Sequence, residues 1–318
     1  MPEISLIVCV RNEDRLLTRL LEHTGGCFDD LVVVNDGANY DNGIEPPVGA
    51  PLKEMAFDYG LLPTQASFPP FYKELSPHDC GRTKVSQQGG RYFEGPRCYQ
   101  QEPHWPFAWW QARHDWILRL DADEFPSEEL KAWLRRFRNL PEPATEISGY
   151  TCLWPLWNGT KAVTKRWPGG RIFLFHRRRV RFFGMVEQVP VPNKPWESLD
   201  LVLHHQPKRK SYGVRNILLR RQAYLWRRVI AQSLMKKPTA LPHWRWTPDV
   251  WPAHWDFARN HPLRYSVTSL IRLPLGQLKG MLEANEFPSI PACLNPGLHH
   301  FMLGLRVFLE KRRFREGQ

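Results

Sequence analysis

Long apolar runs are missing from this sequence of 318 residues, and so are closely paired cysteines. No run approaches the roughly 18–20 apolar residues of a membrane-spanning helix, so we expect a protein that is soluble or attached to a surface. The six cysteines are scattered without a CxxC pair, which favours reduced thiols over a disulfide framework. The apolar run over residues 4–10 follows Glu3 rather than a basic segment, and we expect a first strand there, not a signal peptide.

Acidic residues are also in short supply. The chain has 32 Asp and Glu against 44 Lys and Arg, a formal net charge of +12. Such an excess attracts an anionic partner, which could be nucleic acid, a membrane surface or a phosphorylated substrate. The sequence lacks RNA-binding, zinc-finger and helix-turn-helix signatures, so we do not expect nucleic acid. A hydrophobic content of 42% supports a substantial core and excludes a disordered chain.

The N-terminal part of the chain has the pattern strand, helix, strand. Residues 4–10 and 31–36 are apolar runs typical of strands covered on both faces, and leucines recur at helical spacing between them. Asn12 is the expected N-cap of this helix. The pattern predicts a βαβ unit whose two parallel strands end at the same edge of a sheet, where open α/β sheets bind ligands.

Periodicity is weak between residues 37 and 104, where Pro, Gly and aromatic residues are frequent, as in binding loops and lids. Regular patterns return with a short helix from Pro106. We therefore predict two parts: a catalytic domain over residues 1–205, with a loop insertion at about 40–105, and a helical, basic extension over residues 206–318. The later patterns predict a helix over 128–138, strands within 149–157, 170–183 and 199–207, and helices over 211–232 and 298–314.

Three carboxylates fall within four residues where the strand over residues 116–120 ends, at Asp121, Asp123 and Glu124. Crowded carboxylates repel one another and need a proton, an arginine or a divalent cation. Oxygen ligands suit Mg²⁺ or Mn²⁺, and two carboxylates leave coordination positions for phosphate oxygens. Asp121 and Asp123 are therefore candidate ligands of a metal-diphosphate site. The alternative is an acidic cluster that stabilises the start of the next helix.

Four segments together resemble the family 2 glycosyltransferases with the GT-A fold, and most closely the bacterial branch that builds lipopolysaccharide core and similar envelope glycans. They are "ISLIVCVRNE" at 4–13, "DDLVVVNDGANYDN" at 29–42, "ARHDWILRLDADE" at 112–124 and "GRIFLFHRRRVRFFGMVEQV" at 170–189. The resemblance implies an α/β fold in which a Rossmann-like, nucleotide-sugar-binding mixed sheet is flanked by helices. It also implies an inverting transfer from a nucleotide-sugar, above all a UDP-sugar, to an envelope glycan or a lipid-linked acceptor. The signature of processive relatives, Q-x-x-R-W, is absent, so we expect transfer of a single sugar.

The resemblance assigns donor-binding roles to residues at the strand ends. Asp36 stands where relatives contact the base, although Asp36 and Gly37 could equally form a turn. In the acidic cluster, Asp123 is expected to contact Mn²⁺ or Mg²⁺, and Asp121 to hold the ribose or a metal-bound water. The other residues implied in donor binding are Arg11, Asn12, Glu13 and Arg171.

An inverting transfer needs a base that deprotonates the acceptor hydroxyl. Relatives carry G-x-V-H-E after the arginine-rich strand, whereas this chain has Gly184-Met185-Val186-Glu187-Gln188, a sequence without the His-Glu pair. Glu187 is the first candidate base and Glu124 the second; the alternative for Glu187 is a surface carboxylate paired with an arginine. The missing pair also leaves open a non-catalytic relative that binds a membrane or another protein.

Basic residues concentrate in the second half of the chain. Alternation along a strand would place Arg177, Arg179 and Arg181 on one face, where their guanidinium groups suit phosphates. The helix over residues 298–314, with its basic end, fits an interfacial segment or an ordinary core helix. We expect a cytoplasmic protein that attaches peripherally to the inner face of the plasma membrane. Four tryptophans could stack on sugars, lie at a membrane interface or pack under a loop: Trp244, Trp246, Trp251 and Trp255.

Overall fold

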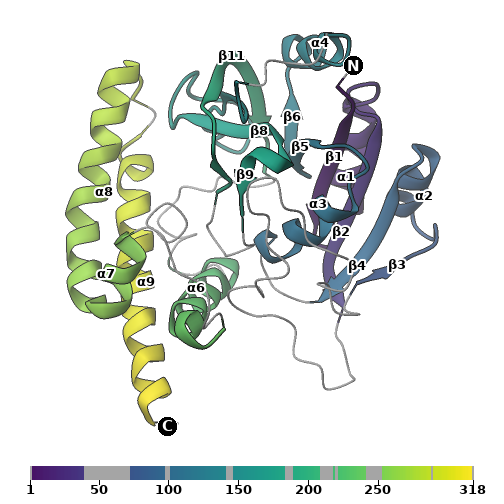
Figure 1. Ribbon diagram of the computed structural model, residues 1–318. Helices are drawn as coiled ribbons and strands as arrows, with labels where there is room; N and C mark the ends of the chain where they lie inside the picture. The colour runs from purple at the N-terminus through teal and green to yellow at the C-terminus, as the bar shows by residue number, and fades with distance from the viewer. Residues whose placement is uncertain are drawn as a thin grey trace.

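The structure is a computed structural model that describes residues 2–38, 72–96, 101–140, 146–182, 189–207, 218, 221–240, 253–287 and 289–316. Its centre is a nine-stranded mixed sheet with helices against it, and further helices from the C-terminal part of the chain lie to one side (Figure 1). The strands follow the order β3-β4-β2-β1-β5-β8-β7-β11-β6. This mixed α/β architecture confirms the fold class that the sequence predicts.

The parallel half of the sheet contains the strands predicted at the N-terminus. β1 (Ile4–Val10) lies between β2 (Asp30–Ala38) and β5 (Trp116–Asp121) and is parallel to both. All seven residues of β1 are buried, as expected for an uninterrupted apolar run. β4 (Arg91–Pro96) extends the parallel order beyond β2, and the two-residue β3 (Lys73–Glu74) pairs with β4. The carboxyl ends of β4, β2, β1 and β5 therefore lie at one edge.

The other half of the sheet runs mostly antiparallel. β8 (Gly170–His176) is antiparallel to β5 and to β7 (Gly149–Leu153). β11 (Trp196–His205) is parallel to β7, and the short β6 (Glu124–Pro126) is antiparallel to β11. β5 and β6 are separated in the chain by two residues, yet three strands stand between them in the sheet order. A separate pair is formed by β9 (Val180–Arg181) and β10 (Val191–Pro192).

Helices cover both faces of the sheet with apolar side chains. On one face, α1 (Asp14–His23) and α4 (Glu128–Phe137) add their leucines to a core that also includes Val85 of α2 (Cys80–Gln87). α4 begins as predicted, because the Ser127 side chain accepts a hydrogen bond from the Leu130 backbone N–H. On the other face, the short helices η3 (Glu102–His104) and α3 (Trp105–Gln111) contribute an aromatic core that includes Trp109 and Phe182.

Three local predictions differ from the structure. The expected insertion at 40–105 includes regular elements, because residues 72–96 form β3, α2 and the internal strand β4. The expected strand over 170–183 ends at His176, and Arg177–Arg179 form the 3-10 turn η4, so Arg177, Arg179 and Arg181 do not share a strand face. Asn12 does not cap α1: Glu13 is the N-cap residue, and it makes no side-chain capping bond.

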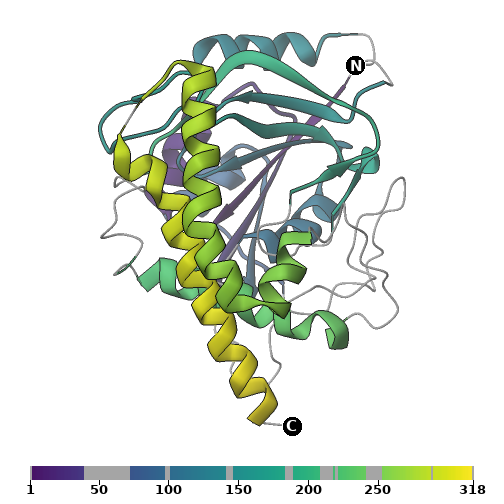
Figure 2. The same cartoon turned by 90° about the vertical axis from the view of Figure 1, so that its left-hand side faces the viewer.

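The C-terminal part of the chain is helical, as expected, with α6 (Arg221–Ala240), α7 (Ala253–Asn260), α8 (Pro262–Ala284) and α9 (Ile290–Glu316). α8, which the sequence patterns did not predict, packs side by side with α9 on the outer side of the molecule (Figures 1 and 2). The division into domains at residue 205 stays a prediction. In the part of the chain that the structure describes, no helix combines the length and hydropathy needed to cross a bilayer.

One carboxylate connects the end of the α8–α9 pair to the segment between β7 and β8. Glu286, in the turn between the two helices, accepts backbone N–H groups from Lys165, Arg166 and Trp167 at 2.7–3.1 Å. Beside it, the Trp167 ring packs with Met281 and Ala292 in a small apolar cluster. These contacts fix the position of the helical pair relative to the sheet.

Candidate functional site

The acidic cluster lies where β5 ends, and an arginine of the neighbouring strand β8 neutralises it. The Nη2 atom of Arg171 lies 2.9 Å from Asp121 Oδ2, and its Nε lies 3.0 Å from Glu124 Oε1. Burial favours the neutral acid at Asp121, but the charges of Arg171 and Arg119 outweigh it, and its pKa falls below the usual value. Asp121 is thus an anion at neutral pH. Its Oδ1 atom is buried and has no hydrogen-bond partner among the described residues.

Glu124 is fully buried, and both of its carboxylate oxygens contact protein groups. Oε1 accepts the indole N–H of Trp154 at 3.0 Å, and Oε2 accepts the Asp121 backbone N–H at 2.9 Å. Burial raises the pKa of Glu124, and the Asp121 charge adds to this effect against the opposing charge of Arg171. A carboxylate that is enclosed in this way stabilises the turn after β5 and is not accessible to the hydroxyl group of an acceptor. The geometry therefore does not favour the prediction of Glu124 as a base.

A second buried arginine stands behind the cluster. Arg119, on β5, is 3% exposed, and its guanidinium group lies 4.3 Å from the centre of the Trp105 ring. Burial and the charge of Arg171 lower the pKa of Arg119 to about 10, so it remains a cation at neutral pH. Two arginines thus accompany the half-buried Asp121 and the buried Glu124, so these four charges balance one another before any ligand binds.

Asp123 is the most exposed carboxylate of the cluster, slightly ahead of Asp121 at 21%. It lies in the turn after β5, its side chain is 24% exposed, and its Oδ2 is 3.5 Å from Nε2 of His205, at the end of β11. The His205 ring stacks on Trp154 with ring centres 4.5 Å apart. Burial alone would lower the pKa of His205, but the hydrogen bond and the charge of Asp123 outweigh it and raise the pKa above the usual value. The segment "LVLHH" at 201–205 continues the family resemblance, but the sequence patterns assigned His205 no role at this turn.

The side chains at this turn fit a divalent cation in their chemistry. Asp123 Oδ2 and His205 Nε2 are 3.5 Å apart, so their hydrogen bond is weak, and a cation could bind between a carboxylate and a neutral imidazole at this spacing. The buried Oδ1 of Asp121, which lacks a partner within the described residues, is a third candidate ligand atom. Two or three protein ligands would leave coordination positions for phosphate oxygens, as is usual for Mg²⁺. Within the described ranges, no group of three or more His, Cys, Asp and Glu side chains is already arranged as a metal site.

The end of β2 carries the second acidic side chain that the sequence singled out. Asp36 is 5% exposed, and its Oδ1 lies 3.3 Å from Nε2 of the buried His104, whose Nδ1 lies 3.3 Å from the Tyr72 hydroxyl. Gly95, opposite Asp36 on β4, makes room for this pair, since a Cβ there would lie 2.8 Å from the Tyr72 ring and 3.0 Å from His104. Sequence reasoning missed His104, which is 68 residues away from Asp36 in the chain.

The segment after β1 meets the end of β2 through two asparagines. The Asn12 backbone N–H donates to Asn35 Oδ1 at 3.0 Å, and Asn35 Nδ2 donates to Asn12 Oδ1 at 3.3 Å. Asn12 has a φ of 52°, a left-handed conformation that asparagine adopts more readily than most residues. Arg11 is exposed and Glu13 half-buried beside it. Residues 11–13 therefore lie at the same edge as Asp36, as the sequence predicted.

The arginine-rich segment lies at the opposite edge. Arg177 and Arg178 place their Nε atoms 2.7 Å from the two oxygens of Asp115, which precedes β5. Arg177 also donates to the carbonyls of Trp109 and Ala112. The length of β8 separates this pair from Arg171, roughly 20 Å at about 3.3 Å per residue, so these arginines do not face the acidic turn. This position does not favour a contact between Arg177 or Arg178 and a diphosphate at the acidic turn, and binding of another phosphate stays a prediction.

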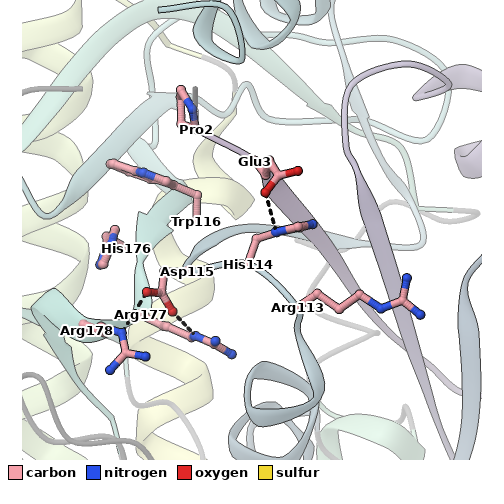
Figure 3. Close-up of a pocket in the computed structure, with 9 residues that line it drawn as sticks. All are labelled: Pro2, Glu3, Arg113, His114, Asp115, Trp116, His176, Arg177 and Arg178. Atoms are coloured by element: carbon pink, nitrogen blue, oxygen red, sulfur yellow. Dashed lines mark hydrogen bonds and ion pairs between the residues drawn. The ribbon is translucent and has the colours of Figure 1, made fainter. Parts of the chain in front are cut away.

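A cavity of about 520 Å³ lies at this opposite edge (Figure 3). It is lined by Pro2, Glu3, Arg113, His114, Asp115, Trp116, His176, Arg177 and Arg178. Asp115 lies between Arg177 and Arg178, and Glu3 faces His114. Its charges are therefore largely paired with one another, and we assign it no role in the reaction.

The remaining candidates fall into two groups. Glu187, Trp244, Trp246 and Trp251 lie outside the described residues. Trp255 is described: it is 7% exposed on α7, and its ring stacks with His300 of α9 at 6.2 Å. Trp255 therefore packs between α7 and α9, so it is an internal packing residue, although the element above it is a helix and not the loop that was expected.

Comparison with known proteins does not assign the chain to a family. No protein-family model and no curated protein sequence matches the chain. Among solved structures, the chain is similar to S. aureus TarS, residues 1–349, over 99% of this chain and 92% of that chain, with 13% sequence identity and a TM-score of 0.38. A similarity of this size does not establish a shared activity, so the chemistry of the site has to be inferred from its own residues.

Proposed function

We propose that this protein is a metal-dependent, inverting glycosyltransferase that moves a single sugar from a nucleotide-sugar to a cell-envelope glycan or a lipid-linked acceptor. The main support is the convergence of Asp36, Asp121 and Asp123 at the carboxyl edge of neighbouring parallel strands, with His205 beside them. Open α/β sheets bind ligands at this edge. The donor we favour is a UDP-sugar.

Residues at different strand ends would contact different parts of the nucleotide-sugar. Asp36, with His104 behind it, would contact the base, and residues 11–13 would lie along the nucleoside. Asp121 would contact the ribose or a metal-bound water. Arg171, expected to bind the donor, already pairs with both Asp121 and Glu124, and we propose that it positions Asp121 instead.

Mn²⁺ or Mg²⁺ would be held by Asp123 and His205, with Asp121 close by, and would stabilise the negative charge that grows on the leaving diphosphate. The chain's own residues prepare this position. Arg171 and Arg119 keep Asp121 charged, and the stacked Trp154 ring holds the His205 imidazole toward Asp123. Glu187 remains our candidate base, since Glu124 is enclosed.

A thermal-shift experiment on the full chain tests this proposal. UDP, UDP-sugars and other nucleotides are compared with and without Mn²⁺, on the natural protein and on Asp123→Asn. We expect a Mn²⁺-dependent rise of the melting temperature with UDP that disappears in Asp123→Asn. Asp200→Asn is the matched control, because Asp200 is 71% exposed and only loosely paired with Arg166 at 3.4 Å. A UDP response of the same size in Asp123→Asn would overturn the metal assignment.

The second candidate function is a non-catalytic protein of the same fold that binds a membrane or a partner. It is favoured by the sequence Glu187-Gln188 where relatives carry His-Glu. Hydrolysis of UDP-sugars in the presence of Mn²⁺ separates the two. Slow release of free sugar would support the transferase, whereas donor binding without any turnover, even with envelope glycans added, would support the second function.

A further inference from the structure

Helix α8 carries an apolar stripe on the face that it turns to solvent. Seven large aliphatic side chains of this helix are 41–60% exposed: Leu263, Val267, Leu270, Ile271, Leu275, Leu278 and Leu282. At 100° per residue they fall within an arc of roughly 140°, and they extend over about 29 Å along the helix axis. Phe287, Ile290 and Leu294, which are also exposed, continue the apolar surface past the end of α8.

The opposite face of α8 is already occupied. Its small buried residues Ser266 and Ser269 lie against Gly304 and Gly297 of α9, where an added Cβ would meet Ser266 or the Ser269 carbonyl. The two helices therefore pack closely through small residues and run side by side (Figure 2). The large aliphatic side chains of α8 remain exposed. Scattered exposed leucines are ordinary on a protein surface, but a continuous stripe of this length is typical of an interaction site.

Basic groups border the stripe. Arg272 and Lys279 lie about 40–60° beyond its edge around the helix. At the N-terminal end of the stripe, Leu263 opens into a hollow of about 340 Å³ between the start of α8 and α9. The charged residues that line this hollow are Arg264, Lys311 and Arg312, and Phe308 is among its apolar walls. Apolar surface and positive charge thus meet along one side of the molecule.

We propose that this surface docks on an anionic lipid bilayer. The stripe would enter the boundary between headgroups and acyl chains, while Arg272, Lys279 and the basic hollow face lipid phosphates. A second copy of the chain fits less well, because α8 has three basic residues and a single acid, Glu283, which already lies 3.7 Å from Lys279. Two such helices would repel each other, whereas anionic lipid is complementary to them.

This docking surface goes beyond the proposed function and needs neither donor nor metal. It also differs from the segment that the sequence singled out, since the apolar face belongs to α8 rather than to the tail of α9. Membrane binding and glycosyl transfer can therefore fail separately in an experiment.

Flotation with lipid vesicles tests the inference on the full chain. The vesicles are phosphatidylcholine alone, or phosphatidylcholine with about 30% phosphatidylglycerol. The test variant is Ile271→Asp with Leu275→Asp; both side chains are 60% exposed, so the fold should tolerate them. The matched control is Leu140→Asp with Val189→Asp, which changes two exposed aliphatic residues, at 44% and 59%, away from α8.

We expect the natural protein and the control to float with anionic vesicles, and the stripe variant to lose at least about tenfold in partition coefficient. Arg272→Gln with Lys279→Gln should reduce the preference for anionic over neutral vesicles. Circular dichroism verifies that the variants fold, and light scattering reports the oligomeric state. The proposal is overturned if the natural protein does not float, or if the stripe variant floats equally well. It is also overturned if the only effect of the stripe substitutions is that a dimeric protein becomes monomeric.

Discussion

Replacing Arg171 with methionine would leave two acidic side chains in the protein interior without their nearest cation. Arg171 lies 2.9 Å from Asp121 Oδ2 and 3.0 Å from Glu124 Oε1, and the Glu124 side chain is fully buried. Removing one partner of a buried pair typically costs about 3–5 kcal/mol, because the other charge stays desolvated. Arg119 remains nearby as a buried cation, so we expect a loss toward the lower end, about 3 kcal/mol.

Urea unfolding at neutral pH measures this loss. With a slope of about 3 kcal/mol per molar, the midpoint of Arg171→Met should fall by about 1 M. Adding Glu124→Gln should restore part of the stability, since the double variant contains one buried charge fewer and can keep the contact with Trp154. Arg178→Met is the control: this arginine is 45% exposed, and its pairing with Asp115 should be worth at most about 1 kcal/mol. If Arg171→Met and Arg178→Met shift the midpoint equally, the arginine does not neutralise the acidic turn.

Two further predictions concern the helical pair. Gly304→Ala should destabilise the protein by about 1–3 kcal/mol, because the new Cβ would collide with Ser266 and lie 2.7 Å from the Pro262 carbonyl. Gly276→Ala is the control: a Cβ at that position has no other atom within 4 Å, so this variant should be neutral or slightly stabilising. Equal melting temperatures for the two variants would contradict the close packing of α8 and α9. The carboxylate of Glu286 accepts hydrogen bonds from the backbone N–H groups of Trp167, Lys165 and Arg166, and these outweigh burial and lower the pKa of Glu286. The charged Glu286 therefore stabilises the fold above about pH 4.5, and this stabilisation is lost as the pH falls through the lowered pKa. Glu286→Gln should therefore lower the melting temperature at pH 7 but much less near pH 3, and an unchanged difference would exclude the role of its charge.

The elements that the sequence predicted best are those with one unambiguous period. β1, β2 and β5 each contain a dense run of large apolar residues, which Arg119 interrupts once in β5. α1 and α4 have amphipathic spacing, and all five elements were confirmed. β4 was missed because its six residues, RYFEGP, contain one glycine, one proline and two charged side chains. α8 was missed for a different reason: Pro274 lies inside it, and its large aliphatic residues occupy the exposed face while small residues occupy the packed one.

The candidate site was predictable in its acidic residues but not in their partners. Strand ends and spacing placed Asp36, Asp121 and Asp123 at one edge, because parallel strands end together. The groups that set their chemistry come from distant parts of the chain: Arg171 is 50 residues from Asp121, and His104 is 68 residues from Asp36. Such pairings depend on the order of strands in the sheet, which single-sequence patterns do not encode.

The order of the strands has a consequence for the acidic turn itself. β5 and β6 follow one another after Ala122 and Asp123, yet β8, β7 and β11 separate them in the sheet. That half of the sheet must therefore bend until β6, paired with β11, comes close to the end of β5, so the turn is fixed at both of its ends. Single side chains of such a turn can be exchanged, but an inserted or deleted residue would shift β6 against β11 and displace the contacts around it. Natural or engineered variants should therefore tolerate substitutions in this turn far more easily than a change in its length.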